Sequence, residues 1–411
     1  MNANATGAAS GSNIAAIRWL TYLMFFMFAM TTDAVGVIIP KVIAEFKLNQ
    51  TTAGALHYGS MAGIMSAGLL LGFLADRFGR RRTILLGLGV FATTAFCVPL
   101  APRFTALLVL ISLAGLAIGV FKTGALALVG DLSSSTRELT STMNLVEGFF
   151  GVGAIVGPLI VTMLAASGVS WRWLYVIAGG LCSILFVIAL LARYPQEPRS
   201  ADAAPRSVVT ALRLVKDPFA LGFSLAAMLY VAVECAIYVW MPTLLSGLSA
   251  SLLVRAGYAL PAFFIMRAAG RFVGAWLLQT FEWSLALLIC AGAILACFAG
   301  SMIGGLQAAL YLLPLSGLFM SIIYPTINSK GIGCFKAEDQ GSVAGVILFF
   351  TCLGAILGPM SMSVLSDRSG DAGVGFWLAT GFCAAFFVAA LHNFHRKPAH
   401  ARLAQNASEV A

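Results

Sequence analysis

Long apolar runs, repeated along almost the whole sequence, constrain this chain more than any other feature. A helix needs about 20 apolar residues to cross the hydrocarbon core of a bilayer. The runs are continuous rather than alternating, which favours helices over a β-barrel. Only 10% of the 411 residues are charged, while 60% are hydrophobic, too few charges for a soluble protein of this length. We expect twelve membrane spans: 17–40, 53–75, 83–101, 105–129, 140–166, 171–192, 219–243, 255–278, 283–303, 306–328, 341–365 and 374–392.

The placement of basic residues predicts the orientation. With a cytoplasmic N-terminus, inner loops and tails hold 16 of the 25 Lys and Arg residues, outer loops hold 6, and 3 lie within spans. Cytoplasmic loops carry an excess of Lys and Arg, so both termini are expected to be cytoplasmic, in the inner membrane of a bacterial-type cell. The expected organisation is a disordered tail over 1–16, a six-helix bundle over 17–192, a linker over 193–217, a second six-helix bundle over 218–392 and a tail over 393–411.

The two halves share motifs at a nearly constant offset. Asp33 in the first span and Glu234 in the seventh are 201 positions apart, and GAIVGP ending at Pro158 repeats as GAILGP ending at Pro359, again 201 positions later. A weaker Gly-Leu pair repeats with an offset of 202. We infer a duplicated six-helix unit. The expected fold is therefore an all-α membrane protein of twelve transmembrane helices in two pseudo-symmetric bundles, an arrangement that transporters use around a central site.

Several function classes lack support in the sequence. The 8 Cys residues form no CxxC pair and no metal-ligand spacing, so we interpret them as packing residues and expect no metal. There is no phosphate-binding GxxxxGK[ST] loop and no nucleophile with its base, so neither ATP-driven transport nor an enzyme is expected. The net charge of +9 marks the inner face and needs no nucleic acid. We expect no cofactor, and a monomer that contains a whole transport pathway.

Six ionisable residues within the spans are the first candidates for function, because charges in lipid are costly and must face a cavity or a partner. Asp33 lies near the midplane, where a buried carboxyl can hold a proton at neutral pH, and we expect it to be the coupling acid, with Glu234 as runner-up. Lys122 and Glu147 lie at similar depth on consecutive helices. They form either a buried ion pair or a proton- or substrate-responsive pair.

The other two intramembrane charges, Arg267 and Arg271, lie four residues apart on one face of the eighth span. Arg271 can snorkel to the inner surface. Arg267 lies one turn deeper, where it binds an anionic substrate or neutralises Glu234 or Glu147. Polar and aromatic residues of spans 1, 4, 5, 7, 10 and 11 add candidates for binding a solute, although most single aromatic residues in a membrane bundle serve packing: Asn144, Tyr230, Tyr238, Trp240, Tyr324, Asn328 and Phe349.

The stretch GFLADRFGRRR, residues 72–82, joins the second and third spans on the inner face. It resembles the signature loop of the major facilitator superfamily, with the pattern carried by Gly72, Asp76, Arg77, Gly79 and Arg80. The resemblance implies that Asp76 and the arginines gate the transporter by holding its outward-facing state, with Asp76 near the start of the eleventh span. The alternative is a plain basic anchor. The corresponding stretch of the second half, AWLLQTFEW, lacks the charges.

Three stretches narrow the resemblance to the fucose-permease branch of that superfamily: TTDAVGVIIP, NLVEGFFGVGAIVGP and SGLFMSIIYPTI. Members of this branch are proton-coupled sugar symporters with an Asp in the first span, which Asp33 matches. One departure is Lys122, where the fucose transporter of that branch has a Glu near its substrate. This charge reversal makes a sugar acid or another organic anion a plausible substrate.

The sequence thus predicts a secondary transporter that couples protons to the uptake of a sugar or sugar acid by alternating access. Its expected partners are the solute, protons and the lipid bilayer. An organic-anion transporter and a drug:proton antiporter of the same fold stay open as alternatives. Efflux is disfavoured because Ile111 stands where drug antiporters carry a membrane arginine, four residues before Gly115.

Overall fold

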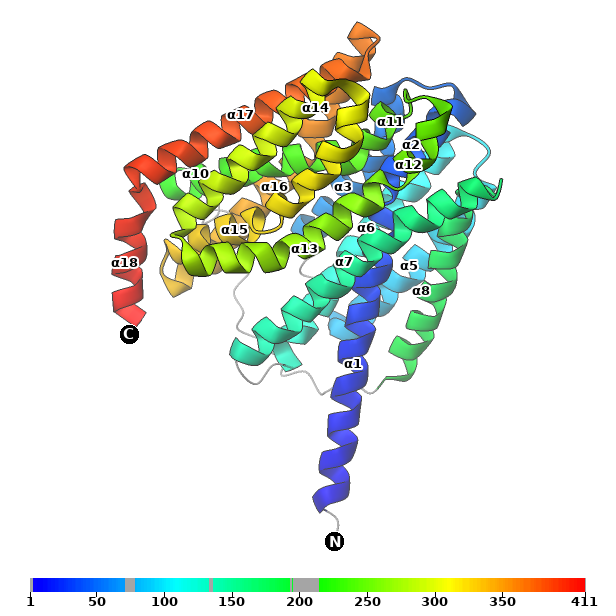
Figure 1. The fold of residues 1–411 in the computed structure, drawn as a ribbon. Coiled ribbons are helices and arrows are strands. Elements are labelled where there is room, and N and C mark those ends of the chain that lie inside the picture. Colours follow the sequence, from blue (N-terminus) through cyan, green and yellow to red (C-terminus); the bar gives the residue numbers. More distant parts are fainter. Residues whose placement is uncertain (1–2, 71–77, 133–135, 193, 195–213, 411) are drawn as a thin grey trace. The chain divides into compact units, whose positions relative to one another are not determined.

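The computed structural model describes residues 3–70, 78–132, 136–192, 194 and 214–410, and these are almost entirely helical (Figure 1). The helices fall into two compact units: Met1–Lys47 with Ala55–Arg199 (unit 1), and Leu48–Gly54 with Ser200–Ala411 (unit 2). The predicted domain boundaries stay predictions. Unit 1 contains most of α3 and the helices α1 (Ala3–Thr32), α2 (Val35–Phe46), α5 (Arg80–Cys97), η1 (Val98–Leu100), α6 (Phe104–Leu132), α7 (Thr136–Ala166) and α8 (Trp173–Leu191).

Unit 2 begins with the first turn of α3 (Gln50–Leu70), so that this one helix runs from unit 2 into unit 1. The remaining helices of unit 2 are α10 (Pro218–Cys235), the π-helical segment η2 (Ala236–Trp240), α11 (Met241–Leu245), α12 (Ala250–Gly257), α13 (Ala259–Thr280), α14 (Trp283–Met320), α15 (Ile323–Gly333), α16 (Ala337–Ser369), α17 (Ala372–Arg396) and α18 (Pro398–Val410).

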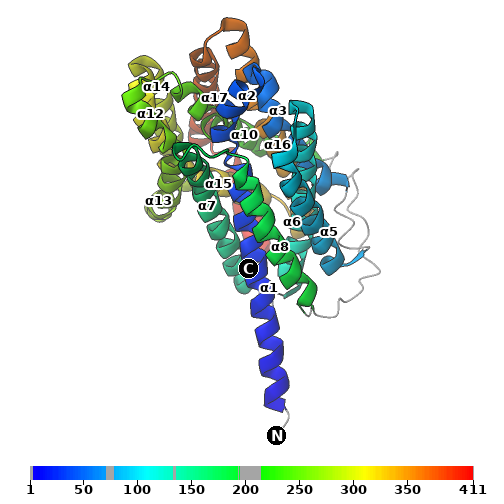
Figure 2. The same cartoon turned by 90° about the vertical axis from the view of Figure 1, so that its right-hand side faces the viewer.

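Glycines let α7 lie directly against the backbone of α1. A Cβ atom added at Gly153 would come within 2.1 Å of the Phe26 carbonyl oxygen, and one at Gly157 within 2.0 Å of the Met30 carbonyl oxygen. Such spacing of small residues allows close helix approach in membranes, where packing rather than the hydrophobic effect drives association. Figure 2 shows α7 and α1 along one side of unit 1, and α5 beside α6.

Unit 2 repeats this contact between α16 and α10. Gly354 lies against the carbonyl of Met228 and Gly358 against Ala232, with closest added-Cβ distances of 2.3 and 2.5 Å. The two glycines of each unit are four residues apart and follow the same offset of 201 that the sequence motifs show. The duplicated motif therefore performs the same packing task twice.

Nine helices of the described part are long and apolar enough to cross a membrane, and the bent pair α12–α13 would make ten. Residues 283–333 count as one of these, although Gly305, with φ 74° and ψ −169°, interrupts the helix between the expected spans 283–303 and 306–328. α3 is helical where the span 53–75 is expected, up to Leu70. A multi-pass membrane protein is thus indicated, and the number twelve stays a prediction.

Both terminal segments are helical in their described parts. The helix α1 begins at Ala3, so the tail predicted to be disordered is helical over its described part. Alanine-rich sequence favours this, because alanine has the highest helix propensity. The second tail forms α18, which Arg402 holds by an ion pair with Asp217, at 3.0 Å, while its guanidinium lies over the rings of Phe219 and Phe335.

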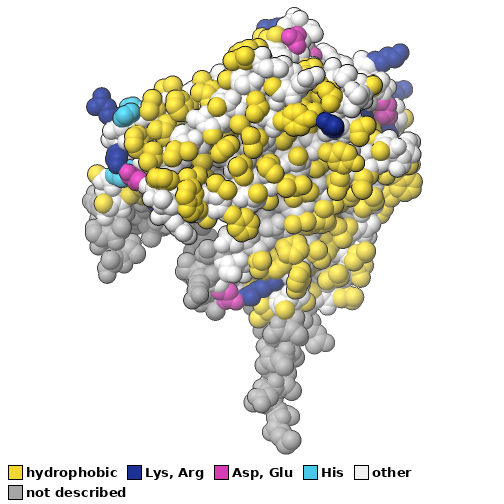
Figure 3. Space-filling model, viewed as in Figure 1, with side chains coloured by type: hydrophobic (Ala, Val, Ile, Leu, Met, Phe, Trp, Pro, Cys, Tyr) yellow, Lys and Arg dark blue, Asp and Glu magenta, His cyan; other side chains and the backbone are white. Residues whose placement is uncertain are grey.

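Exposed hydrophobic side chains mark the lipid-facing surface. Figure 3 shows them spread over α13 and α14, with charged side chains gathered toward the margins. Phe272 of α13 is 82% exposed and Ile303 of α14 is 80% exposed. A soluble surface rarely carries so much contiguous apolar area, whereas lipid tails are a suitable solvent for it.

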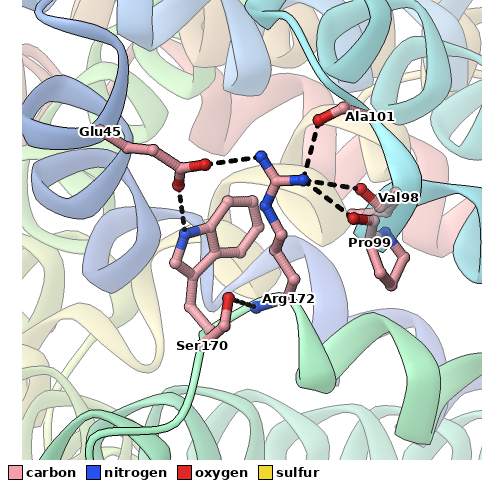
Figure 4. A network of polar contacts seen from close by, with 7 residues as sticks. Glu45, Val98, Pro99, Ala101, Ser170 and Arg172 are labelled. Carbon is pink, nitrogen blue, oxygen red and sulfur yellow. Dashed lines mark hydrogen bonds and ion pairs between the residues drawn. The ribbon is translucent and has the colours of Figure 1, made fainter.

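Arg172 ties three helix ends of unit 1 together (Figure 4). Its Nη1 donates to the carbonyl oxygens of Pro99 and Ala101, at 3.1 and 2.9 Å, and its Nη2 pairs with Glu45 at 2.7 Å. Trp171 Nε1 donates to the other oxygen of Glu45. The fork of the guanidinium thus joins the start of α8 to the ends of α5–η1 and α2.

Candidate functional site

The first span is not one continuous helix, and its break carries Asp33. The helix α1 ends at Thr32, Asp33 and Ala34 form a turn, and α2 begins at Val35. Asp33 is only 7% exposed. Discontinuous helices in transporters place polar backbone and ionisable side chains at the depth of the substrate, so the break puts this acid in a suitable place for coupling.

The hydroxyl of Thr32 can serve Asp33 in either protonation state. Thr32 Oγ1 lies 3.0 Å from Asp33 Oδ2 and 3.1 Å from the Phe28 carbonyl oxygen. A hydroxyl has one hydrogen to donate. With the acid ionised, that hydrogen goes to Asp33. With the acid protonated, Asp33 donates to Thr32 Oγ1, which then donates to Phe28. Both forms therefore keep a hydrogen bond here.

Lys122 of α6 lies over aromatic rings of α1. Its Nζ is 5.7 Å from the ring centroid of Phe25 and 5.3 Å from that of Phe28. Cation–π contacts of this kind stabilise a desolvated ammonium by up to about 2 kcal/mol. Glu147 and Asn144, three residues apart on α7, are exposed side chains of unit 1. The Lys122–Glu147 pair and the binding role of Asn144 stay predictions.

The seventh span changes from α-helical to π-helical geometry two residues after Glu234, the residue that matches Asp33. The helix α10 ends at Cys235, and the next five residues form the π-helical segment η2. Glu234, 6% exposed, stands in the last turn of α10. Short π-helical segments inside α-helices occur frequently at functional sites. Both repeat mates therefore sit at or near a change of helical geometry in their spans.

Glu234 forms an ion pair with Arg267 of α13, with Oε1 and Nη1 2.5 Å apart. This contact agrees with one of the two interpretations of Arg267, neutralisation of Glu234, while binding of an anionic substrate by Arg267 stays a prediction. A buried pair of this kind is hard to break from one side, because removal of either charge leaves the other uncompensated in a low-dielectric environment. The pair links α10 to α13 within unit 2.

The predicted tyrosines of the seventh span have partners inside unit 2. Tyr230, 1% exposed, donates from its hydroxyl to the Met320 carbonyl oxygen at 2.9 Å. Tyr238 Oη lies 2.9 Å from Cys235 Sγ, and Trp240 Nε1 donates to the Pro359 carbonyl oxygen at 2.9 Å. These contacts brace the π-helical segment and the end of α14. Substrate binding by Tyr230 and Tyr238 stays a prediction.

Tyr324 and Asn328 lie on α15, which follows a short interruption after Met320. They are four residues apart, so they share one face of the helix. Both side chains are half-buried. A partly accessible phenol and amide on one face can offer hydrogen bonds to a hydroxylated solute, and this role also stays a prediction.

The predicted gating loop lies mostly outside the described residues, including Gly72, Asp76 and Arg77. Gly79 has φ 89° and ψ 152° and precedes α5, which begins at Arg80. A non-glycine residue rarely adopts this angle, so Gly79 permits the turn into α5. Arg81 Nη2 donates to the Leu190 carbonyl oxygen at 2.6 Å, which makes at least this arginine an anchor within unit 1.

The pKa of Tyr194, which lies beside Arg81, is raised by burial. The Arg81 guanidinium lies 5.8 Å from the ring centroid of Tyr194. Burial raises the pKa of Tyr194 to about 12, against which the positive charge of Arg81 acts weakly. Tyr194 therefore stays neutral and packs as an aromatic surface for the arginine.

Two polar residues with defined contacts escaped the sequence reasoning. His57 on α3 is 1% exposed, and Asp367 on α16 accepts hydrogen bonds from the first backbone N–H groups of α3. A search for titratable residues in spans that included histidine would have found His57. No local signal marks Asp367, because its partners are 316 and 317 residues away.

Within the described ranges no group of three His, Cys, Asp or Glu side chains could hold a metal ion. The 8 Cys residues are all free thiols. Cys334, just beyond the span that ends at Gly333, shows the effect of its surroundings: burial raises the pKa of its thiol to about 11. Such a thiol is unreactive at neutral pH.

Comparison with known proteins covers nearly the whole chain. The family model described as Major Facilitator Superfamily matches residues 21–359. Protein TsgA of Shigella flexneri is 23% identical over 391 residues, which cover 92% of this chain and 95% of that protein. A TsgA homolog of Serratia proteamaculans (strain 568) is 20% identical over 387 residues, with the same coverage of 92% and 95%.

Two solved transporters share the fold. The nucleoside transporter NupG superposes with a TM-score of 0.73 at 17% identity, over 93% of this chain and 99% of that chain. The Escherichia coli fucose:proton symporter FucP superposes with a TM-score of 0.63 at 20% identity, over 91% and 97%. At these identities the likeness shows the fold and leaves the substrate open.

Proposed function

Because the chain belongs to the Major Facilitator Superfamily, and is a multi-pass membrane transporter of small solutes rather than an enzyme, we propose that it couples proton movement to uptake of a neutral, hydroxyl-rich solute. The observation that carries this proposal is the buried Asp33 at the α1–α2 break, where Thr32 and Phe28 can satisfy either protonation state. A buried acid with a hydrogen-bond partner for each of its two protonation states can take up and release a proton during a transport cycle.

Glu234 has a different role in this proposal. Its ion pair with Arg267 gives each side chain a partner of opposite charge, and removal of either one would leave the other uncompensated. The pair holds α10 against α13 while Asp33 carries the proton. Glu147, exposed on α7, is the remaining proton-coupling candidate. It contributes if it pairs with Lys122 in one state of the cycle.

The charges favour a neutral solute over an organic anion. Arg267 is neutralised by Glu234, and Lys122 is held over the rings of Phe25 and Phe28. NupG is a nucleoside transporter and FucP a fucose:proton symporter, and both solutes are neutral and carry sugar hydroxyls. We therefore propose sugars and nucleosides as the first candidate substrates and sugar acids as the second. Lipophilic drugs, which an antiporter would export, are the third.

A thermal-shift panel identifies the solute class first, because a ligand that binds only the folded protein raises its melting temperature. The probes are L-fucose, uridine, glucuronate and tetraphenylphosphonium. Stabilisation by fucose or uridine supports the proposal. Stabilisation by glucuronate alone, lost in Lys122→Gln, would favour the organic-anion alternative. Stabilisation by the lipophilic cation alone would favour efflux.

Proteoliposomes loaded with the stabilising solute then test coupling. We expect Asp33→Asn to abolish uptake driven by a pH gradient while it retains exchange of labelled for unlabelled solute. The matched control is Asp371→Asn, which makes the same chemical change at the start of α17 and should retain both activities. Equal loss of uptake and exchange in Asp33→Asn, with the control active, would contradict the coupling role.

The resemblance of residues 72–82 to the superfamily's signature loop adds a gating proposal. Gly79 precedes α5, which begins at Arg80. The acidic residue of the loop, Asp76, is expected to stabilise one conformational state of the transport cycle. Asp76→Asn should change the accessibility of introduced cysteines from the two membrane sides and leave solute binding intact. Unchanged accessibility would support the basic-anchor interpretation instead.

A further inference from the structure

A small cavity lies in unit 1 beside the α1–α2 break. Its volume is about 20 Å³, and its polar lining consists of Thr31, Thr32, His57, Ser60 and Tyr175. Each of these five side chains is at most 8% exposed. A cavity of at least about 10–15 Å³ with several polar partners can hold a water molecule. This cavity therefore has room and hydrogen-bonding groups for one water.

His57 gives the cavity a titratable wall. It is 1% exposed and its ring meets that of Tyr58 edge-on, with centroids 6.0 Å apart. Histidine changes charge near neutral pH. The sequence predicts that α3 belongs to the second span, and an ionisable residue inside a membrane span is a candidate for function. A phenylalanine would fill the same space without the free-energy cost of burying a polar imidazole, so packing alone does not explain a histidine here.

Thr32 connects the cavity to Asp33. Thr32 lines the cavity, and its hydroxyl lies 3.0 Å from Asp33 Oδ2. A water in the cavity that bonds to the imidazole and to Thr32 Oγ1 would complete a hydrogen-bonded path from His57 to Asp33. The path consists of one imidazole, one water, one hydroxyl and one carboxyl.

The other elements around the cavity add few competing charges. Tyr175 of α8 is the other titratable side chain of the lining, while α5 and α6 contribute the apolar Phe91, Ile111, Ala114 and Ile118. The charged residue of α6 closest in sequence to this wall is Lys122, which lies over Phe25 and Phe28 of α1. Asp33 belongs to the α1–α2 break itself.

We propose that His57 and Asp33 form one proton-exchanging pair, connected through Thr32 and a water held in this cavity. In the transfer, the imidazolium N–H bond breaks and a bond to the water oxygen forms. The water gives one hydrogen to Thr32 Oγ1, and Thr32 gives its own to the Asp33 carboxylate. One proton moves from imidazolium to carboxylate, and no electrons are exchanged. This inference rests on the proposed function, in which Asp33 is the coupling acid.

Infrared difference spectroscopy of the purified protein in lipid tests the pair without any solute. The carbonyl band of a protonated carboxyl that disappears in Asp33→Asn reports the titration of Asp33. Groups that share a proton titrate as a coupled pair. We therefore expect His57→Gln to move the midpoint of that titration by about one pH unit. The control His392→Gln, on α17, should leave the midpoint unchanged. Equal midpoints in His57→Gln and the unmodified protein would overturn the inference.

A reciprocal measurement keeps the inference testable if His57→Gln fails to fold. The sequence has 4 His residues, so replacement of His392, His395 and His400 leaves His57 as the single imidazole signal in ¹⁵N NMR. Asp33→Asn in this background should move the His57 titration by a similar amount, and an unmoved titration would overturn the pair. Neither readout needs transport. Linked titrations of His57 and Asp33 without proton-driven uptake would refute the proposed function and support the pair. Proton-driven uptake with unlinked titrations would support the proposed function and refute the pair.

Discussion

The carboxylate of Asp367 on α16 holds the beginning of α3, and its removal gives a sharp prediction. Asp367 Oδ1 accepts from the backbone N–H of Gln50 at 2.9 Å, and Oδ2 accepts from that of Thr51 at 2.8 Å. The first N–H groups of a helix have no partner within the helix. An anion at this end also interacts favourably with the helix dipole. The carboxylate therefore satisfies two donors and complements their charge.

The expected magnitude follows from these two hydrogen bonds. Asp367→Asn keeps one acceptor oxygen and places an NH₂ group against the other backbone donor. One hydrogen bond to a charged acceptor, about 1.5–3 kcal/mol, and a dipole contribution of about 0.3–1 kcal/mol are lost. Asp367 is half-buried, so hydrogen bonds to water compensate for part of the lost interaction energy. A net loss of about 1.4 kcal/mol corresponds to a tenfold change in the opening equilibrium.

Hydrogen exchange of the amides of Gln50 and Thr51 measures this opening directly, because exchange reports the free energy of local unfolding. In lipid nanodiscs we expect both amides to exchange about tenfold faster in Asp367→Asn. The Thr52 amide, which donates to Asn49 Oδ1 at 2.8 Å, should change less. Asp371→Asn is the control, because Asp371 caps α17 through Gly373. Unchanged exchange at Gln50 and Thr51 would refute the reasoning.

Three further predictions concern packing, a surface network and pH. Gly157→Ala should lower the free energy of unfolding by about 1–3 kcal/mol in a thermal unfolding assay, because the added Cβ would lie 2.0 Å from the Met30 carbonyl oxygen. The control is Gly151→Ala, which has open space around it and should leave the stability unchanged. Arg172→Lys should destabilise by about 2 kcal/mol, since the single nitrogen of lysine cannot stand both at Nη1, which bonds to the Pro99 and Ala101 carbonyls, and at Nη2, which bonds to Glu45. Arg103→Lys on the neighbouring exposed loop serves as its control. Lys397, then His400, hold the pKa of Glu282 below its usual 4.5, so the contribution of Glu282 to the docking of α18 is complete above that value and is lost as the pH falls through the lowered pKa. A spin label at Ala404 should gain mobility over that range, although Arg402 still contacts Asp217. A label that is equally mobile at all pH values, or unaffected by Glu282→Gln, would contradict this.

The repeated motif shows how much of the fold the sequence can predict. The offset of 201 between GAIVGP and GAILGP has a physical counterpart, since Gly153 and Gly354 meet backbone carbonyls of α1 and α10 in the same way. Small residues at helix contacts are a local signal with one physical meaning. Hydropathy likewise predicted the apolar helices, because bilayer thickness sets their length.

Hydropathy does not show where a span is interrupted. The break at Asp33 and the π-helical segment after Cys235 leave the apolar run intact, because backbone geometry can change without a change in composition. The sequence also does not show which side chains surround a charged residue. The ammonium of Lys122 lies over Phe25 and Phe28 of α1, and the sequence does not indicate these neighbours. That contact depends on how α6 crosses α1, which no local pattern encodes.

Asp33 and Glu234 occupy matching positions, and their contacts explain why duplicated acids need not share a role. Each stands at or near a change of helical geometry in its span, a turn at Asp33 and a π-helical segment that begins two residues after Glu234. Glu234 faces the guanidinium of the half-buried Arg267, and removal of either charge would leave the other uncompensated. Asp33 meets a hydroxyl that can reverse its hydrogen bond, and a proton there changes the direction of donation while the bond persists. Divergence of a single partner, from hydroxyl to guanidinium, is thus enough to separate an acid suited to carrying a proton from an acid suited to holding two helices together.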